Sequence, residues 1–248
     1  MTSLISAELL KIRTTRLPAV TITVVLLIAA ALPVLYAAAS GSGDLEPVNP
    51  ASLTEMLAAP SKLAGGGLLL IGLLLAAGEF RHRTIYTTRL GEPRPHRVLA
   101  AKLIAMIFTG LAVGVALDLV TVGVGGAVIA YHGEAVEPFS HGFPRVALLV
   151  PLVLAVHGVI GVAVGALLRS TAAAIGVTLM WAFVVEGIVP MVFRKPEMAI
   201  WLPRGAIQDL LSAQTTTQLS LGTAGALIVG YAAALVAAAV LHDHRREL

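Results

Sequence analysis

Residues 17–39 read LPAVTITVVLLIAAALPVLYAAA, a run without a single charged side chain. About 20 consecutive apolar residues are enough for an α-helix to cross the hydrocarbon core of a membrane. Five further apolar runs follow, at about 63–79, 98–131, 146–168, 171–193 and 221–241. The sequence therefore predicts an all-α membrane protein with six transmembrane helices, built as one transmembrane domain over residues 1–248.

The composition agrees with this class. Hydrophobic residues make up 57% of the chain and charged residues 12%, whereas soluble domains contain about 25% charged residues. A soluble protein of this size could not bury so much apolar surface, so lipid must form part of the solvent. The chain has no cysteine, which excludes disulfides and thiolate metal sites. A net charge of +3 with scattered basic residues gives no reason to expect a nucleic-acid partner.

A short segment, residues 3–16, precedes the first apolar run. Three of its apolar side chains recur at helical spacing: Ile5, Leu9 and Ile12. Charged residues, among them Glu8 and Lys11, lie elsewhere on the helical wheel, so we expect an interfacial helix that leads into the first span. A secretory signal cleaved near residues 37–39 is an alternative interpretation, but the run is longer than the apolar part of such signals.

Two features of the later runs constrain the fold. The run at 98–131 is too long for one straight span, so this helix must be tilted, broken or extended beyond the bilayer. The runs at 146–168 and 171–193 are separated only by Arg169 and Ser170, which demands a tight antiparallel hairpin.

The basic residues predict the orientation of the six spans. With the N-terminus inside, 12 of the 17 Lys and Arg residues fall in cytoplasmic segments and 5 in outer segments. Cytoplasmic loops carry the excess of Lys and Arg in most membrane proteins. We therefore expect both termini in the cytoplasm, and the largest basic cluster on the loop between spans two and three.

That loop reads GEFRHRTIYTTRLGEPRP over residues 78–95. A short helix is expected from about Thr84 to Leu90, with Gly91 at its C-terminal end and prolines at 93 and 95 that prevent its continuation. Its basic residues could contact anionic lipid head groups. Alternatively, a compact helix at this position is a docking surface for a cytoplasmic partner, because a rigid helix transmits force and a flexible loop does not.

Four stretches together resemble a known family. These are ELLKIR at 8–13, EFRHRT at 79–84, PRPHR at 93–97 leading to Lys102, and GALLRST at 165–171. In this order, and over essentially the whole chain, the sequence resembles the type-2 ABC permeases of bacterial exporters. The resemblance implies a multi-pass subunit of a bacterial plasma membrane that moves amphipathic or hydrophobic substrates, such as drugs, antibiotics or lipid-like molecules, out of the cell.

The resemblance also assigns roles to segments. The loop of residues 79–91 corresponds to the family's coupling helix, which docks on a separate ATPase subunit. The residues expected at that contact are Glu79, Arg81, Arg83, Thr84 and Tyr86. The outer segment 194–220 is similar to the connection that dips into the outer leaflet as re-entrant short helices in this family. The partners implied are ABC ATPase subunits, which would hold ATP and Mg, and a second permease, either a copy or a relative.

The chain itself lacks the residues of an ATP site. A phosphate-binding loop needs glycines followed by Gly-Lys, and none of the four lysines, Lys11, Lys62, Lys102 and Lys195, follows a glycine. No motif of a hydrolase or a metalloprotease is present either, so we expect no enzyme, no cofactor and no metal site in this chain. The alternative function is a membrane scaffold or immunity protein that binds a partner without transport.

Three ionisable residues fall inside predicted spans: Asp118, His157 and Glu186. A charge in hydrocarbon is costly, so each should face protein or water. Two interpretations stay open, an interhelical structural lock and the lining of a substrate path. Small residues at 110 and 114, and at 158, 161 and 165, offer packing faces between helices of one chain or, less favoured, between two chains.

Overall fold

The computed structural model describes residues 1–41, 47–49, 52–81, 84–136, 142–192, 194, 196–212 and 219–244. Within these ranges the chain forms helices and short connections, without any β-strand. Six helical segments in the same ranges are long and apolar enough to cross a membrane. The predicted all-helical class and the six spans are confirmed in this form.

The elements follow the order of the predicted runs. Their bounds are α1 Thr2–Thr14, α2 Arg16–Gly41, α3 Ser52–Arg81, α4 Ile85–Gly91, α5 Pro95–Tyr131, α6 Phe143–Leu168, α7 Thr171–Met180, the π-helix η1 Trp181–Ile188, α8 Val189–Val192, the 3₁₀-helix η2 Pro196–Trp201, α9 Pro203–Leu210 and α10 Leu221–His244.

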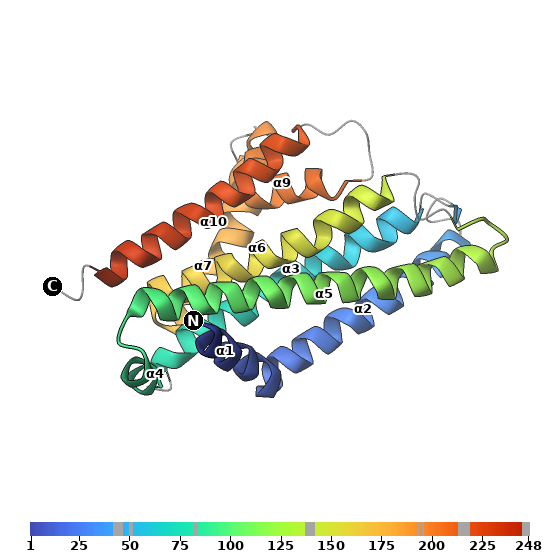
Figure 1. The fold of residues 1–248 in the computed structure, drawn as a ribbon. Coiled ribbons are helices and arrows are strands. Elements are labelled where there is room, and N and C mark those ends of the chain that lie inside the picture. The colour runs from blue at the N-terminus through green and yellow to red at the C-terminus, as the bar shows by residue number, and fades with distance from the viewer. Residues whose placement is uncertain are drawn as a thin grey trace.

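Helices α3, α5 and α6 form the centre of the bundle, with α2 against α3 and α5 and with α10 against α6 (Figure 1). Large apolar side chains that are fully shielded from solvent fill this centre, among them Leu68, Met106 and Leu154. The end of the bundle that carries α1 and α4 is called the α4 end below. The opposite end, where α9 lies, is called the α9 end.

Glycines let α3 and α6 pack backbone against backbone. A Cβ on Gly161 would collide with the carbonyl of Leu69, and one on Gly165 would lie 2.5 Å from the carbonyl oxygen of Leu73. On α3, Gly72 faces the backbone of Gly158 in the same way. Small residues at a helix interface permit such close approach, which favours helix association where no hydrophobic effect drives it.

Helices α5 and α6 also pack backbone against backbone at glycines. Gly110 lies against the backbone of Ala155, and Gly114 lies against Pro151. Together with the α3–α6 contacts, these positions account for all five small residues singled out in the sequence. The structure therefore uses them for packing within one chain, which is the favoured interpretation of the two.

Helix α3 begins at Ser52, well before the apolar run that predicted it. Its first three turns contain Pro60 and several polar residues, so hydropathy alone does not extend the span this far. Three of these polar residues are buried inside the protein: Ser52, Thr54 and Ser61. The early start is explained by neighbouring helices, which cover polar groups that lipid could not accommodate.

Helix α5 contains the long third apolar run, residues 98–131, and shows that this run is not broken. It is one continuous α-helix of 37 residues, from Pro95 to Tyr131, with its only proline at the start. At 1.5 Å per residue it is about 55 Å long, whereas the hydrocarbon core of a bilayer is about 30 Å thick. The helix is unbroken, so its excess length must be taken up by tilt or by extension beyond the bilayer.

The junction of α6 and α7 is as tight as predicted. Arg169 adopts a left-handed conformation with φ 50° and its backbone N–H donates to the carbonyl of Gly165 at 3.0 Å. Ser170 then caps α7, because its hydroxyl accepts the N–H of Ala173 at 3.4 Å. A left-handed residue followed by a serine cap reverses the chain within two residues.

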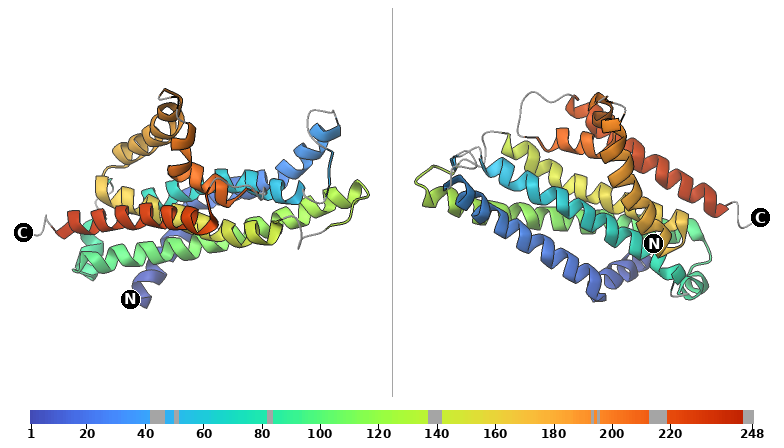
Figure 2. Two further views of the ribbon diagram at one scale, coloured as in Figure 1. Left: turned by 90° about the horizontal axis from the view of Figure 1, so that it is seen from above. Right: turned by 180° about the vertical axis from the view of Figure 1, so that it is seen from behind.

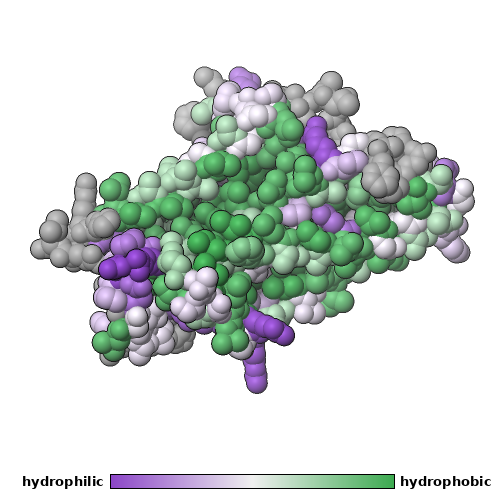
Figure 3. Space-filling model, viewed as in Figure 1, coloured by the Kyte–Doolittle hydropathy of each residue, from purple (hydrophilic) through white to green (hydrophobic). Residues whose placement is uncertain are grey.

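The fifth apolar segment leaves the bundle. It runs from α7 through η1 to α8, and Figure 2 shows it rising away from the other helices. Only 6% of its most apolar stretch is buried, against 56% of that of α6. The face that carries α5, α6 and α10 is mostly hydrophobic, and hydrophilic side chains gather near the start of α5 (Figure 3). Apolar surface of this extent suits a lipid environment or a second protein.

Candidate docking site at the α4 end

Four charged side chains meet inside the α4 end, and they come from three helices. Glu8 and Lys11 belong to α1, Glu79 to the last turn of α3 and Lys102 to the second turn of α5. We call these four residues the ion cluster. Glu8, Glu79 and Lys102 are only 3%, 7% and 4% exposed. These buried charges are shielded from water, so opposite charges within the cluster must stabilise them instead.

Lys102 is the centre of the cluster. Its Nζ lies 3.0 Å from Glu8 Oε2 and 2.7 Å from Glu79 Oε1, and it also donates to the carbonyl of Leu75 at 3.3 Å. An ammonium has three donors, so all three are used. One side chain thus fastens the start of α5 to the end of α3 and to α1.

Lys11 closes the cluster from the outside. Its Nζ donates to Glu8 Oε1 at 2.8 Å and to Glu79 Oε1 at 2.7 Å. Burial by itself would lower the pKa of Lys11, but the hydrogen bonds to Glu79 and Glu8 outweigh it and raise the pKa above its usual 10.5. Lys11 therefore stays protonated throughout the physiological pH range and faces both carboxylates as a cation.

The cluster changes the interpretation of α1. The helix itself is confirmed, but Glu8 faces inward beside Ile12 and not outward with the other charged residues. Helical spacing places Glu8 between the apolar and polar faces, and its partner Lys102 lies 94 residues away in the sequence. Sequence periodicity contains no signal for that pairing, which depends on the tertiary fold.

Helix α4 follows the cluster directly. It begins one residue later than expected, with Thr84 as its N-cap, and Gly91 is its last residue. The hydroxyl of Thr87 donates to the carbonyl of Thr84 at 2.7 Å and tightens the first turn. Two large side chains one turn apart, Tyr86 and Leu90, are 69% and 86% exposed. This is an unpaired apolar ridge on a short helix whose flanks are anchored.

The predicted contact residues divide into two groups. Arg81, Thr84 and Tyr86 are exposed at the α4 end, where a partner could reach them. Glu79 instead points into the protein and holds the lysines of the ion cluster. Arg83 lies outside the described residues. Leu90 was not among the predicted residues, because its exposure depends on how α4 is oriented.

The chain is also fastened after α4. Glu92 Oε2 lies 3.5 Å from Arg97 Nη1 on the first turns of α5, which opens with Pro95. Proline at the first position of a helix costs no hydrogen bond and fixes the entry of the chain. Helix α4 is thus held by charged contacts on both sides, through the ion cluster before it and through this pair after it.

A second ionic contact joins α10 to the same end. Arg169 Nη2 lies 2.6 Å from Asp243 Oδ1, and the guanidinium stacks 5.3 Å above the ring centre of Phe80. The two-residue turn between α6 and α7 is thereby tied to the last turn of α3 and the last turn of α10. A cation over an aromatic face adds to the ion pair. Helices α1, α3, α5 and α10 and the α6–α7 turn therefore contribute side chains to the polar contacts of this end.

The three ionisable residues inside the spans have separate surroundings. His157 Nδ1 lies 2.8 Å from the carbonyl oxygen of Val153, and its ring packs against Gly65. Glu186 Oε1 accepts the indole N–H of Trp181 at 2.7 Å within η1. Asp118 Oδ1 is buried without a hydrogen-bond partner among the described residues.

Asp118 and His157 also lie at different depths. The contact of Gly110 with Ala155 places His157 about level with Phe108 on α5. Asp118 lies about ten residues farther along, roughly 15 Å along the helix axis. These two residues therefore do not form one polar cluster. Whether any of the three lines a substrate path stays a prediction.

The connection between the fifth and sixth apolar segments contains the short helices η2 and α9, and its predicted re-entry into the outer leaflet stays a prediction. Arg145 at the start of α6 donates to the carbonyls of Asp209, Leu210 and Ser212 at 3.0 to 3.4 Å. A cation at the C-terminal end of a helix also offsets the helix dipole. Asp209 Oδ2 accepts the N–H of Leu219 at 2.9 Å. Arg145 thus fixes this connection to the bundle.

No protein-family model matches the chain, and no curated protein matches it. Its function must therefore be argued from the chemistry and the placement of the residues described above.

Proposed function

We propose that the chain is the transmembrane permease subunit of an ATP-driven bacterial exporter for amphipathic or hydrophobic substrates. In this proposal α4 docks on a separate ATPase subunit at the cytoplasmic face. The observation that supports it most is the exposed ridge of Tyr86 and Leu90 on a short helix that charged contacts hold on both sides. Exposed aromatic and large aliphatic side chains on a rigid element are the usual anchors of protein interfaces.

The ion cluster connects the region of α4 to other helices, which a docking site must do if it is to transmit force. The start of α4 is six residues from Glu79, and Glu79 is joined to α1 and α5 through Lys11 and Lys102. A force applied at α4 would move the ends of three helices together and not bend one loop. Interfaces and packed cores of this kind switch between discrete arrangements, which suits alternating access.

We expect a second permease to pack against the helical segment that leaves the bundle. The segment α7–η1–α8 leaves the other helices and exposes large side chains, among them Phe183 at 70% and Met191 at 81%. One chain has too few helices to enclose a path for a large substrate. We infer that a second copy, or a related permease, packs against this segment and that the path forms between the two.

Co-expression with candidate ATPase subunits tests the docking proposal. A Tyr86→Ala/Leu90→Ala variant and an Arg81→Glu/Arg83→Glu variant should each reduce co-purified ATPase at least ten-fold, because they remove the anchors and the basic rim. Tyr131→Ala is the matched control, since Tyr131 is 88% exposed at the α9 end. Unchanged assembly and ATPase rate in both variants would reject the docking site.

A transport assay with the assembled complex tests the proposed export function. Reconstituted vesicles should show ATP-dependent movement of an amphipathic probe, and this movement should be lost in the same two variants. Assembly without any nucleotide-dependent transport would instead favour the membrane scaffold or immunity function.

A further inference from the structure

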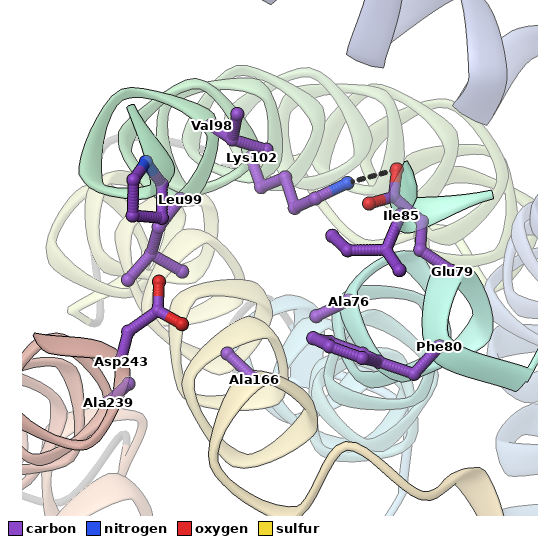
Figure 4. A pocket seen from close by; sticks show the side chains of 11 residues that line it. Ala76, Glu79, Phe80, Ile85, Val98, Leu99, Lys102, Ala166, Ala239 and Asp243 are labelled. Atoms are coloured by element: carbon purple, nitrogen blue, oxygen red, sulfur yellow. Dashed lines mark hydrogen bonds and ion pairs between the residues drawn. The ribbon is translucent and has the colours of Figure 1, made fainter. Parts of the chain in front are cut away.

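A hollow lies at the α4 end between the first turns of α5 and the last turns of α10 (Figure 4). Its apolar wall includes Phe80, Leu99 and Ala239. A second, smaller hollow adjoins it, with Val240 in its wall, and shares Leu99 and Asp243 with the first. The two hollows form one groove, called the α5–α10 groove below.

One wall of the groove carries an unsatisfied acceptor. The side chain of Glu79 is 8% exposed, and its Oε1 accepts hydrogen bonds from Lys11 and Lys102. Its other oxygen, Oε2, is buried and has no hydrogen-bond partner among the described residues. A buried carboxylate oxygen without a donor is costly and rare in native proteins. The groove therefore presents an acceptor for a donor that these residues do not supply.

The opposite wall carries a second carboxylate. Figure 4 shows Asp243 across the hollow from Glu79, with apolar side chains around the hollow. Lys102 has used its three donors within the protein, and Arg169 Nη2 is paired with Asp243, whereas Arg169 Nε is buried without a hydrogen-bond partner among the described residues. What remains on the Glu79 wall is an unused carboxylate oxygen, which accepts a hydrogen bond and cannot bond to a group without donors. A cation with N–H donors satisfies it, as a charge-assisted hydrogen bond.

The position of the groove adds an apolar requirement. Both α5 and α10 are apolar enough to cross a membrane, and between them the groove is lined by Leu99, Ala239 and Val240. The hollow is small, so it has room for a head group and the first methylenes and not for a bulky molecule. A longer apolar tail would continue along the hydrophobic surface of the two helices.

We propose that the α5–α10 groove binds the primary ammonium head of an amphipathic amine, with Glu79 Oε2 as the acceptor. Two sources share this chemistry: an aminophospholipid such as phosphatidylethanolamine, and a free long-chain amine. The site lies within one chain and needs no ATPase, so it goes beyond the export proposal. Either proposal can fail while the other holds.

Native mass spectrometry of the purified full-length chain tests the site. Phosphatidylethanolamine should be retained at least ten-fold better than phosphatidylcholine with the same acyl chains, because a trimethylammonium has no N–H donor. Dodecylamine should likewise exceed dodecyltrimethylammonium. Retention of dodecylamine alone assigns the groove to free amines, and displacement of bound phosphatidylethanolamine by dodecylamine assigns it to both. Equal retention of the primary and the trimethylated heads would overturn the proposal.

Variants locate the binding. Ala239→Leu places a larger side chain in the groove and should abolish the preference for primary amines. Ala238→Leu is the matched control, because Ala238 is the exposed neighbour on the same helix. Glu79→Gln replaces the acceptor and should also lose the preference. If Ala239→Leu retains amines as Ala238→Leu does, the groove is not the site. Should Glu79→Gln fail to fold, the alanine pair and the head-group preference of the unmodified chain decide the question.

Discussion

At the scale of single residues, Lys102 joins three helices, although nothing in the sequence around it predicts this role. It lies in an apolar run, yet its ammonium meets two carboxylates and a carbonyl. Removing one partner from a buried ionic cluster leaves charges without compensation, at a cost of about 3–5 kcal/mol. The stability of the α4 end therefore depends strongly on this one side chain.

Replacing Lys102 by methionine should lower the thermal unfolding midpoint of the detergent-solubilised protein by several degrees. Glu8 and Glu79 would then share only Lys11. Lys62→Met is the control, because Lys62 is an exposed lysine on α3. Adding Glu8→Gln to Lys102→Met should recover part of the loss, since it removes one of the uncompensated charges. Equal midpoints for the Lys102 and Lys62 variants would show that the cluster does not stabilise the fold.

The candidate site could be predicted from the sequence only in part at this scale. The loop of residues 79–91, its helix and the exposure of Arg81, Thr84 and Tyr86 follow from local signals, namely charge, glycine and proline. The inward position of Glu79 does not, because its partners Lys11 and Lys102 are 68 and 23 residues away. Long-range ion pairs leave no local pattern in a single sequence.

At the scale of elements, the contact of α3 with α6 is set by glycines. Gly161→Ala would drive a methyl group into the backbone of Leu69 and force the two helices apart. Overpacking of this kind costs about 1–3 kcal/mol, so we expect a lower unfolding midpoint. Gly176→Ala on α7 is the control, because a Cβ there meets nothing within 4 Å. A midpoint for Gly161→Ala equal to that of the control would contradict the close α3–α6 contact.

The turn between α6 and α7 gives a second prediction for elements. Arg169→Gly keeps the left-handed turn, which glycine adopts freely, but removes the ion pair to Asp243. Residues 239–244 at the end of α10 should then exchange amide hydrogens about five-fold faster, which corresponds to a loss of about 1 kcal/mol. Arg13→Gln, at an exposed position on α1, should leave that exchange unchanged.

Arg169→Ala separates the two roles of this residue. It loses the same ion pair and also places a Cβ in the left-handed region, so its global stability should fall below that of Arg169→Gly. Unaltered exchange at residues 239–244 in both variants would mean that the pair does not hold α10.

The helix boundaries show which features of the secondary structure the sequence predicts and which it does not. The ends of α2, α5, α6 and α10 lie within a few residues of the predicted runs, since a change from apolar to polar residues coincides with the end of each helix. The start of α3 does not, because buried Ser52, Thr54 and Ser61 are polar residues that neighbouring helices cover. The π-helical turn of η1 also had no predictor, although Trp181 and Glu186 are five residues apart, the spacing that such a turn brings together.

At the scale of the whole molecule, the number and order of the six long apolar segments follow from hydropathy alone, whereas their arrangement does not. The divergence of α7–η1–α8 from the bundle could not be foreseen, because the fifth apolar run is, like the other five, apolar enough to cross a membrane. The fifth segment, whose most apolar stretch is only 6% buried, is the part of the chain most in need of a second protein.

Single cysteines test this arrangement cleanly, because the chain contains none. Phe183→Cys on η1 should cross-link to a second permease in membranes that contain the assembled complex. Leu148→Cys is matched in exposure, since both residues are 70% exposed, but it lies on α6 and should remain uncross-linked. Cross-linking at Leu148 in preference to Phe183 would place the interface on another face.

The continuity of α5 has a geometric consequence. From Lys102 to Tyr131 the helix is continuous over about 44 Å and contains no proline, and Lys102 fastens its start to α1 and α3. A rotation of about 5° at this point would sweep its far tip through about 4 Å, given that length. If the helix turns as one unit, a small rotation at the ion cluster thus becomes a displacement wider than a water molecule at the far tip. In this way α5 would act as a lever arm.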